Sequence, residues 1–258
     1  MDKERLKLLC NSFGVSSGEQ PVARILKDGY GALCDELKYD RLGSVFGIKK
    51  SKNPKAATLM VASPLDEVGL MVSEVKKDGT LAFIPLEGVA LNSLLHQRVR
   101  ILTREDTYID GVVGMDKKAL EDSCEIKGAD DLFITCGLSG EEAKEQIHPG
   151  DLLGYASPYA EQGGTVMAKA LFPRVLNEVT LELLERVKDA EFDFHLAVGG
   201  VAQSVIGYRG TKTATYVVRP DAAIALTAFD TAKRKIQLGD QVILGYYDRQ
   251  MLPSQAFL

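Results

Sequence analysis

The chain has 258 residues, of which 45% are hydrophobic, and its formal net charge is −5. This length predicts one or two domains, and this composition excludes general disorder because it supplies ample apolar surface for a packed core. The sequence has no long basic run, so we expect no nucleic-acid partner and interpret the lysine cluster at 49–55 as a solvated loop. No segment approaches the ~18 unbroken apolar residues of a membrane span, so we expect no membrane partner.

The N-terminal segment, residues 1–14, carries charges from its start and shows no apolar signal region. The four cysteines are widely spaced and form no C-x-x-C pair, which predicts ordinary buried thiols in a reducing cytoplasm. The three histidines are equally scattered, and no H-x-x-x-H, H-E-x-x-H or phosphate-loop motif occurs. No single short motif therefore names the chemistry of this chain.

The first part of the chain predicts two helices followed by strands. Residues 2–13 have an apolar face, and Gly14 is expected to stop that helix. Ser17 and Gln20 have the spacing of a capping box, which predicts the start of a second helix. Strands are expected at Glu36–Asp40, Ser44–Lys49 and Ala57–Ala62. The last of these is apolar on both faces, as a central parallel strand would be.

The pattern changes after Gly69. From about residue 72 to residue 155 the sequence consists of short β segments separated by turns, with a hairpin expected around Lys77-Asp78-Gly79. One helix, Gly140–Gln146, interrupts the strands. This pattern predicts a small β-barrel or sandwich rather than βαβ units.

Alternation of helix and strand resumes after Gly163-Gly164. A helix is expected at Val175–Lys188, a strand at 192–200, a short helix at Gly210–Tyr216 and a buried strand from residue 222 onward. We therefore predict an α/β domain formed by residues 1–71 and 164–258, with a β-rich domain, residues 72–163, inserted into it.

Asp66 and Glu67 follow the apolar strand directly and are the first candidates for a functional site. A carboxylate pair at the C-terminal edge of a sheet suits a ligand or catalytic site of an α/β protein. The alternative is a strand-end turn whose acids face solvent or bond backbone amides. Two further segments have structural interpretations: Phe172, before Pro173, as a core or staple residue, and Ser204 as a loop residue without the G-x-S-x-G pattern.

Several segments, taken in order, resemble one family. They read FGVSSGEQ (13–20), DRLGSVFG (40–47), MVASPLDEVGLMV (60–72), IPLEGVALNSLLHQRVRI (84–101), GLSGEEAKEQIHPGD (137–151), VMAKALFPR (166–174), VAQSVIGYRG (201–210) and PDAAIALT (220–227). Together they resemble the glutamyl-aminopeptidase family, the cellulase M-like or TET-type metallo-aminopeptidases. The resemblance implies a zinc-peptidase-like α/β sandwich with an inserted β-barrel-like dimerisation domain. It also implies a hydrolase with two zinc or cobalt ions that releases N-terminal residues from peptides.

Each functional role of the family can be mapped onto one position of this sequence, and most of these positions hold residues that cannot perform the role. The first histidine ligand falls on Pro64, the metal-bridging aspartate on Phe172, the general-base glutamate on Ser204, the neighbouring glutamate ligand on Val205 and the next aspartate ligand on Thr227. Only Asp66, which in the family supports the metal-bound histidine, is retained. The resemblance implies that the last histidine ligand lies in a C-terminal segment, which we expect this chain to lack.

The resemblance and these replacements together favour a non-catalytic homologue, a pseudo-peptidase that acts in assembly or regulation. We expect no bound metal, a homo-oligomer, and possible mixed assembly with active paralogues. The neutral or apolar replacements predict an old pocket that is repacked as core, because clustered carboxylates without cations would repel one another. The alternative is a metal-dependent aminopeptidase or another hydrolase with an atypical site.

Overall fold

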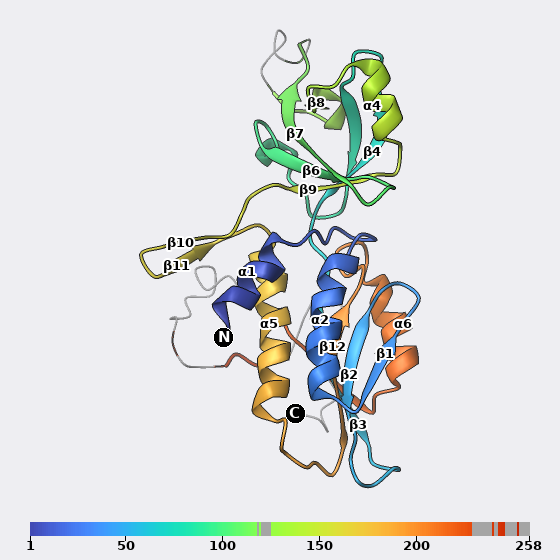
Figure 1. Cartoon of the computed structure of the whole chain (residues 1–258), viewed down its shortest axis with the longest axis vertical. Coiled ribbons are helices and arrows are strands. Elements are labelled where there is room, and N and C mark those ends of the chain that lie inside the picture. Colours follow the sequence, from blue (N-terminus) through green and yellow to red (C-terminus); the bar gives the residue numbers. More distant parts are fainter. Residues whose placement is uncertain (118, 120–124, 229–238, 240–241, 246–251, 253–258) are drawn as a thin grey trace.

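The structure is a computed structural model that describes all residues except 118, 120–124, 229–238, 240–241, 246–251 and 253–258. A sheet covered by helices forms the lower part of the molecule in Figure 1, and a β-barrel stands above it. The helices are α1 (Lys3–Asn11), α2 (Gln20–Leu33), α4 (Gly140–Gln146), α5 (Leu171–Arg186) and α6 (Arg209–Val218), with short 3₁₀ turns η1 (Leu91–Ser93) and η2 (Ala129–Asp131). The strands are β1 (Glu36–Tyr39), β2 (Val45–Lys49), β3 (Thr58–Pro64), β4 (Leu70–Val75), β5 (Leu81–Pro85), β6 (Arg98–Leu102), β7 (Tyr108–Met115), β8 (Leu132–Thr135), β9 (Leu152–Tyr155), β10 (Ala160–Gln162), β11 (Thr165–Met167), β12 (His195–Val201) and β13 (Ala222–Ala225).

The main sheet is mixed and has the strand order β1-β2-β12-β3-β13. Strand β3 runs parallel to both β12 and β13, with His195 opposite Thr58 and Ala222 opposite Leu59. The predicted central parallel strand at 57–62 is therefore confirmed. Helices α1, α2 and α5 cover one face of the sheet through Leu9, Leu26 and Leu181, whereas α6 packs against the other.

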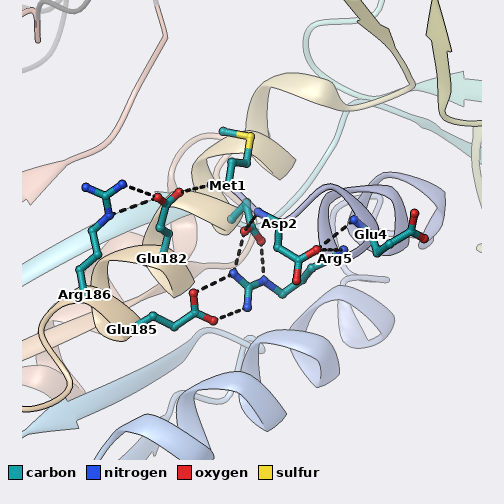
Figure 2. A network of polar contacts seen from close by, with 8 residues as sticks. Met1, Asp2, Glu4, Arg5, Glu182, Glu185 and Arg186 are labelled. Atoms are coloured by element: carbon teal, nitrogen blue, oxygen red, sulfur yellow. Dashed lines mark hydrogen bonds and ion pairs between the residues drawn. The ribbon is translucent and has the colours of Figure 1, made fainter. Parts of the chain in front are cut away.

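Charged groups fix α1 against α5 (Figure 2). The carboxylate of Glu178 is fully buried, and it accepts hydrogen bonds from Arg5 Nε at 2.6 Å and Nη2 at 2.7 Å. Hydrogen bonds to Glu178, and then to Glu185, raise the pKa of Arg5 above its ordinary value. The α-amino group of Met1 lies 2.9 Å from the carboxylate of Glu182. The N-terminal helix is thus held by charge as well as by apolar packing.

The six strands between Leu70 and Tyr155 close into a barrel in the order β4-β5-β8-β7-β6-β9. Its interior is filled by buried aliphatic and aromatic side chains from every strand, among them Leu81, Phe83 and Ile134. The predicted hairpin is confirmed: Gly79 has a φ of +87° in the turn between β4 and β5. The predicted helix at Gly140–Gln146 is also confirmed, and Ser139 caps it with Glu142 as a capping box.

Four local predictions need correction. The capping box at Ser17 is wrong, because α2 has Glu19 at its N-cap with no side-chain cap, and Ser17 has a φ of +74°. Helix α5 begins at Leu171 rather than Val175, so Pro173 lies within its first turn. Helix α6 extends one residue earlier and two residues later than expected. The strand at 222–225 is not buried, because β13 is an edge strand of the described sheet with largely exposed side chains.

Candidate functional site

A cavity of about 760 Å³ opens where the carboxyl ends of β3, β12 and β13 meet the first turns of α5 and α6. The six residues to which the family roles map all line it, namely Pro64, Asp66, Phe172, Ser204, Val205 and Thr227. Parallel strands bring their carboxyl ends to one edge, which explains why segments far apart in the sequence meet here. The structure thus brings every sequence-predicted site residue to one pocket.

Asp66 lies buried at the floor of this pocket, and both of its carboxylate oxygens are already hydrogen-bonded. Oδ1 accepts from the backbone N–H of Ser204 at 2.8 Å. Oδ2 accepts from the backbone N–H of Val205 at 2.9 Å and from the hydroxyl of Ser16. Burial raises the pKa of Asp66, while these hydrogen bonds act in the opposite direction. Asp66 therefore holds the loop after β12 against the turn before α2.

Glu67 is also buried, but cations surround it. Lys169 Nζ lies 2.8 and 2.9 Å from its two carboxylate oxygens, and Arg174 Nη2 lies 3.3 Å away. Burial lowers the pKa of Lys169, and the charge of Glu67 opposes that shift. Glu67 also accepts a hydrogen bond from the backbone N–H of Gly14 at 3.1 Å. Within the structural interpretation of Asp66 and Glu67, exposure of the acids to solvent is wrong and hydrogen bonding to backbone amides is confirmed.

Glu19 is a third buried carboxyl group that sequence reasoning did not single out. It is 2% exposed and accepts a hydrogen bond from the backbone N–H of Gln203 at 2.9 Å. Burial raises the pKa of Glu19 to about 7, and the nearby charge of Asp66 contributes in the same direction. The sequence did contain a signal for Glu19, because this residue occupies the glutamate position of the turn in FGVSSGEQ that resembles the family.

The walls of the pocket are mostly apolar, and side chains do not fill the space between them. Phe172 lines the cavity and remains 48% exposed, so its interpretation as a core or staple residue is wrong. Thr227 is exposed as well. The carbonyl oxygen of Pro64 accepts a hydrogen bond from Asn177 Nδ2 at 2.9 Å. The expectation of a pocket repacked as core is therefore wrong, because the residues at the mapped ligand positions line an open cavity instead of filling it.

The donor groups of this pocket do not fit a pair of zinc or cobalt ions. A zinc site needs about three or four convergent His, Asp, Glu or Cys donors. Among the residues that the structure describes, no three such side chains come together in a group that could hold a metal ion. The carboxylate of Asp66 accepts three hydrogen bonds, and the charge of Glu67 is balanced by two cations.

An α/β sheet, a barrel joined to it and a pocket at the carboxyl ends of the strands define the class of zinc-peptidase-like folds. The M42 glutamyl aminopeptidase family matches residues 43–257, and the chain belongs to this family.

Named relatives agree with that assignment. The glutamyl aminopeptidase of Lactococcus lactis subsp. cremoris is 31% identical over 97% of this chain and 75% of its own length. The lysyl aminopeptidase of Pyrococcus furiosus is 30% identical over 88% of this chain and 66% of its own length. Among solved structures, a TET aminopeptidase from a marine-sediment Thaumarchaeota archaeon matches with a TM-score of 0.85 at 30% identity, covering 98% of this chain and 75% of that one. An aminopeptidase from Desulfurococcus kamchatkensis matches with a TM-score of 0.80 at 31% identity, covering 88% of this chain and 62% of that one.

The chain thus spans between 62% and 75% of the length of these four proteins. The comparisons confirm the resemblance and the α/β fold with its barrel. Within the described part of the chain, no helix has the length and apolar character to cross a membrane.

Proposed function

We propose that this chain is a non-catalytic member of the M42 family that acts in assembly or regulation. The observation that carries the proposal is the chemistry of the pocket: at the mapped ligand positions stand Pro64, Phe172, Val205 and Thr227, which offer no carboxylate or imidazole. Ser204, at the position of the general base, donates its hydroxyl to the carbonyl of Val201 at 3.0 Å. A serine hydroxyl in that role is a poor proton acceptor.

Metal analysis combined with a peptidase assay tests this proposal. Purified protein is dialysed against zinc or cobalt and then against metal-free buffer, and its metal content is measured by mass spectrometry. Hydrolysis of glutamyl-, leucyl- and lysyl-p-nitroanilide is followed in parallel, with the Lactococcus lactis glutamyl aminopeptidase as the active control. We expect less than about 0.1 equivalent of metal per chain, since a zinc site needs more donors than the pocket provides.

The alternative function, a metal-dependent aminopeptidase or hydrolase with an atypical site, makes the opposite prediction. About one or two equivalents of retained metal, lost together with activity in Asp66→Asn, would establish it and end the pseudo-peptidase proposal. Activity that is unaffected by Asp66→Asn would instead indicate a contaminating peptidase.

We further propose that the chain forms a homo-oligomer in which residues 72–163 act as an inserted dimerisation domain, flanked by one peptidase-like domain from 1–71 and 164–258. Supporting this, a TET1 peptidase of Pyrococcus horikoshii, 23% identical with a TM-score of 0.76, assembles into a tetrahedron or a large octahedral shell. Two half-exposed apolar side chains of the barrel, Ile84 and Val112, offer contact surface. Mixed assembly with active paralogues and residence in the cytoplasm remain parts of the same proposal.

Analytical ultracentrifugation at micromolar concentration tests the assembly. We expect at least a dimer, and we expect Ile84→Asp combined with Val112→Asp to shift it toward monomer. Tyr216→Asp, at an even more exposed aromatic position on α6, serves as the control and leaves the mass unchanged. A wild-type chain that sediments as a monomer would leave the assembly proposal without support.

A further inference from the structure

The cavity at the carboxyl ends of β3, β12 and β13 combines a large volume with an unusual chemical character. Its volume, about 760 Å³, lies within the range of about 300–1,000 Å³ that is typical of small-molecule sites. Three large apolar side chains on its lining are left half exposed by the fold: Phe172 at 48%, Tyr208 at 54% and Ile224 at 42%. A ligand that covers these side chains would remove apolar surface from water, at about 25 cal/mol for each Å².

The buried carboxylates that line the cavity are already paired or hydrogen-bonded. Asp66 accepts three hydrogen bonds, and Glu67 is paired with Lys169 and Arg174. The hydroxyl of Thr215, on the α6 side of the cavity, donates to the carbonyl of Thr211 at 2.7 Å. A charged ligand would therefore lose its hydration without gaining a buried partner, which is costly in an apolar environment. The third carboxylate on the lining, Glu87, is exposed to solvent, so an ion pair with it would contribute little.

From these two observations we infer that the pocket binds an uncharged, largely apolar small molecule with an aromatic or branched aliphatic body. Phe172 and Tyr208, at the starts of α5 and α6, present aromatic rings from opposite elements of the lining. A peptide N-terminus is a poor candidate, because the buried carboxylates that could receive its ammonium group are committed to Lys169, Arg174 and backbone N–H groups.

This inference deepens the proposed function and rests on it in one respect, namely that metal chemistry is absent from the same site. Its test measures binding rather than hydrolysis, so the two can fail separately. Retained metal with turnover would overturn the proposed function. Absence of pocket binding in a metal-free, inactive protein would overturn only the inference.

The first probe is N-phenyl-1-naphthylamine, an uncharged fluorophore whose emission rises in apolar surroundings. Titration of the full chain should give saturable binding of about one molecule per chain, with a dissociation constant on the order of 1–10 μM. Ile224→Lys places a charge on the pocket wall and should weaken binding by about tenfold or more. Tyr39→Lys, at a position of similar exposure on the opposite edge strand β1, should change it less than about twofold. Equal binding by both variants would place the probe elsewhere and overturn the inference.

The second arm tests the charge of the ligand. 8-Anilinonaphthalene-1-sulfonate has the same aromatic body with an added sulfonate, and it should bind at least about tenfold more weakly than the uncharged probe, because the pocket offers its charge no free partner. Leucinamide, which carries the ammonium group of a peptide N-terminus, should not displace the uncharged probe at millimolar concentration. Tighter binding of the sulfonate, or displacement by leucinamide, would refute an uncharged ligand.

A third arm does not depend on Ile224→Lys folding correctly. The chain contains no tryptophan, so Phe172→Trp places a single reporter in the pocket. Menthol, an uncharged branched alcohol that does not absorb in this range, should shift its emission maximum to shorter wavelength. Tyr216→Trp, on α6 but outside the lining, is the matched control and should show no shift. No shift in Phe172→Trp, or an equal shift in both variants, would count against the pocket.

Discussion

Replacement of Arg5 by methionine should destabilise the protein strongly, although Arg5 lies far from the pocket. The substitution keeps an unbranched apolar stem but removes the guanidinium that donates to Glu178 at 2.6 and 2.7 Å. Because Glu178 is fully buried, its charge would be left in an apolar surrounding with a single remaining donor, the backbone N–H of Asp2 at 3.0 Å.

The magnitude follows from the burial of the two partners. Loss of one partner from a fully buried ion pair costs about 3–5 kcal/mol. The side chain of Arg5 is 21% exposed, so water can reach part of the vacated space, and the N–H of Asp2 remains. Contacts with the half-exposed Glu185 add little. We therefore expect a loss of about 2–3 kcal/mol, or roughly 5–10 °C in Tm for a chain of this length.

Urea unfolding followed by far-ultraviolet circular dichroism is a suitable assay, because four of the five described α-helices pack on the main sheet. Lys3→Met is the matched control, since the exposed Lys3–Glu161 pair should leave the midpoint unchanged. The double variant Arg5→Met, Glu178→Met should recover at least about 1 kcal/mol, because apolar residues can replace a buried pair at little cost. A loss below about 1 kcal/mol in Arg5→Met, or no recovery in the double variant, would refute this reasoning.

Two further predictions concern buried groups elsewhere in the chain. The pKa of Glu19 is about 7 in the folded state and lies near its ordinary value of 4.5 in the unfolded state. Between these two pH values the folded chain holds a proton that the unfolded chain has lost. The free energy of unfolding therefore falls as pH rises through this range. Relative to wild type, Glu19→Gln should therefore gain on the order of 2 kcal/mol between pH 5 and pH 8 in chemical denaturation; a pH-independent difference would contradict the assigned burial. Gly79→Ala should destabilise the barrel by more than about 2 kcal/mol, because its Cβ would meet the carbonyl oxygen of Leu138 at 2.2 Å. Gly137→Ala, also at positive φ but with no neighbour within 4 Å, should cost only about 1 kcal/mol, and equal losses in calorimetry would sink the steric argument.

Much of the architecture could be predicted because its signals are local. An apolar run on both faces indicated the central strand β3, and the period change after Gly69 indicated the barrel. The hairpin at Gly79 and the helix at Gly140–Gln146 depend on residues close together in the sequence, so short-range chemistry defines them.

The predictions that failed depend on partners distant in the sequence. Ser17 has the spacing of a cap, yet its hydroxyl accepts from Gln203 Nε2 at 3.1 Å, and this contact draws it away from α2. Apolar composition suggested that β13 is buried, but in the described sheet it pairs with β3 alone. The mapping of family roles onto neutral residues rests on the sequence alone, whereas the cavity lined by Phe172 and Ile224 depends on backbone positions that the sequence pattern does not reveal.

The route of the chain through the barrel has a consequence for the order of folding. Strands β4 and β9 are hydrogen-bonded neighbours, with Leu70 opposite Leu153. A formed barrel therefore brings together the points where the chain enters it and leaves it. All of its strands emerge from the ribosome before β12, the central partner of β3, has been synthesised. A barrel that closes first would shorten the free loop between β3 and β12, which lowers the entropy lost when these two strands pair. The barrel would then act during synthesis as an intramolecular clamp, and variants that weaken it would delay formation of the sheet while leaving the sheet's own contacts untouched.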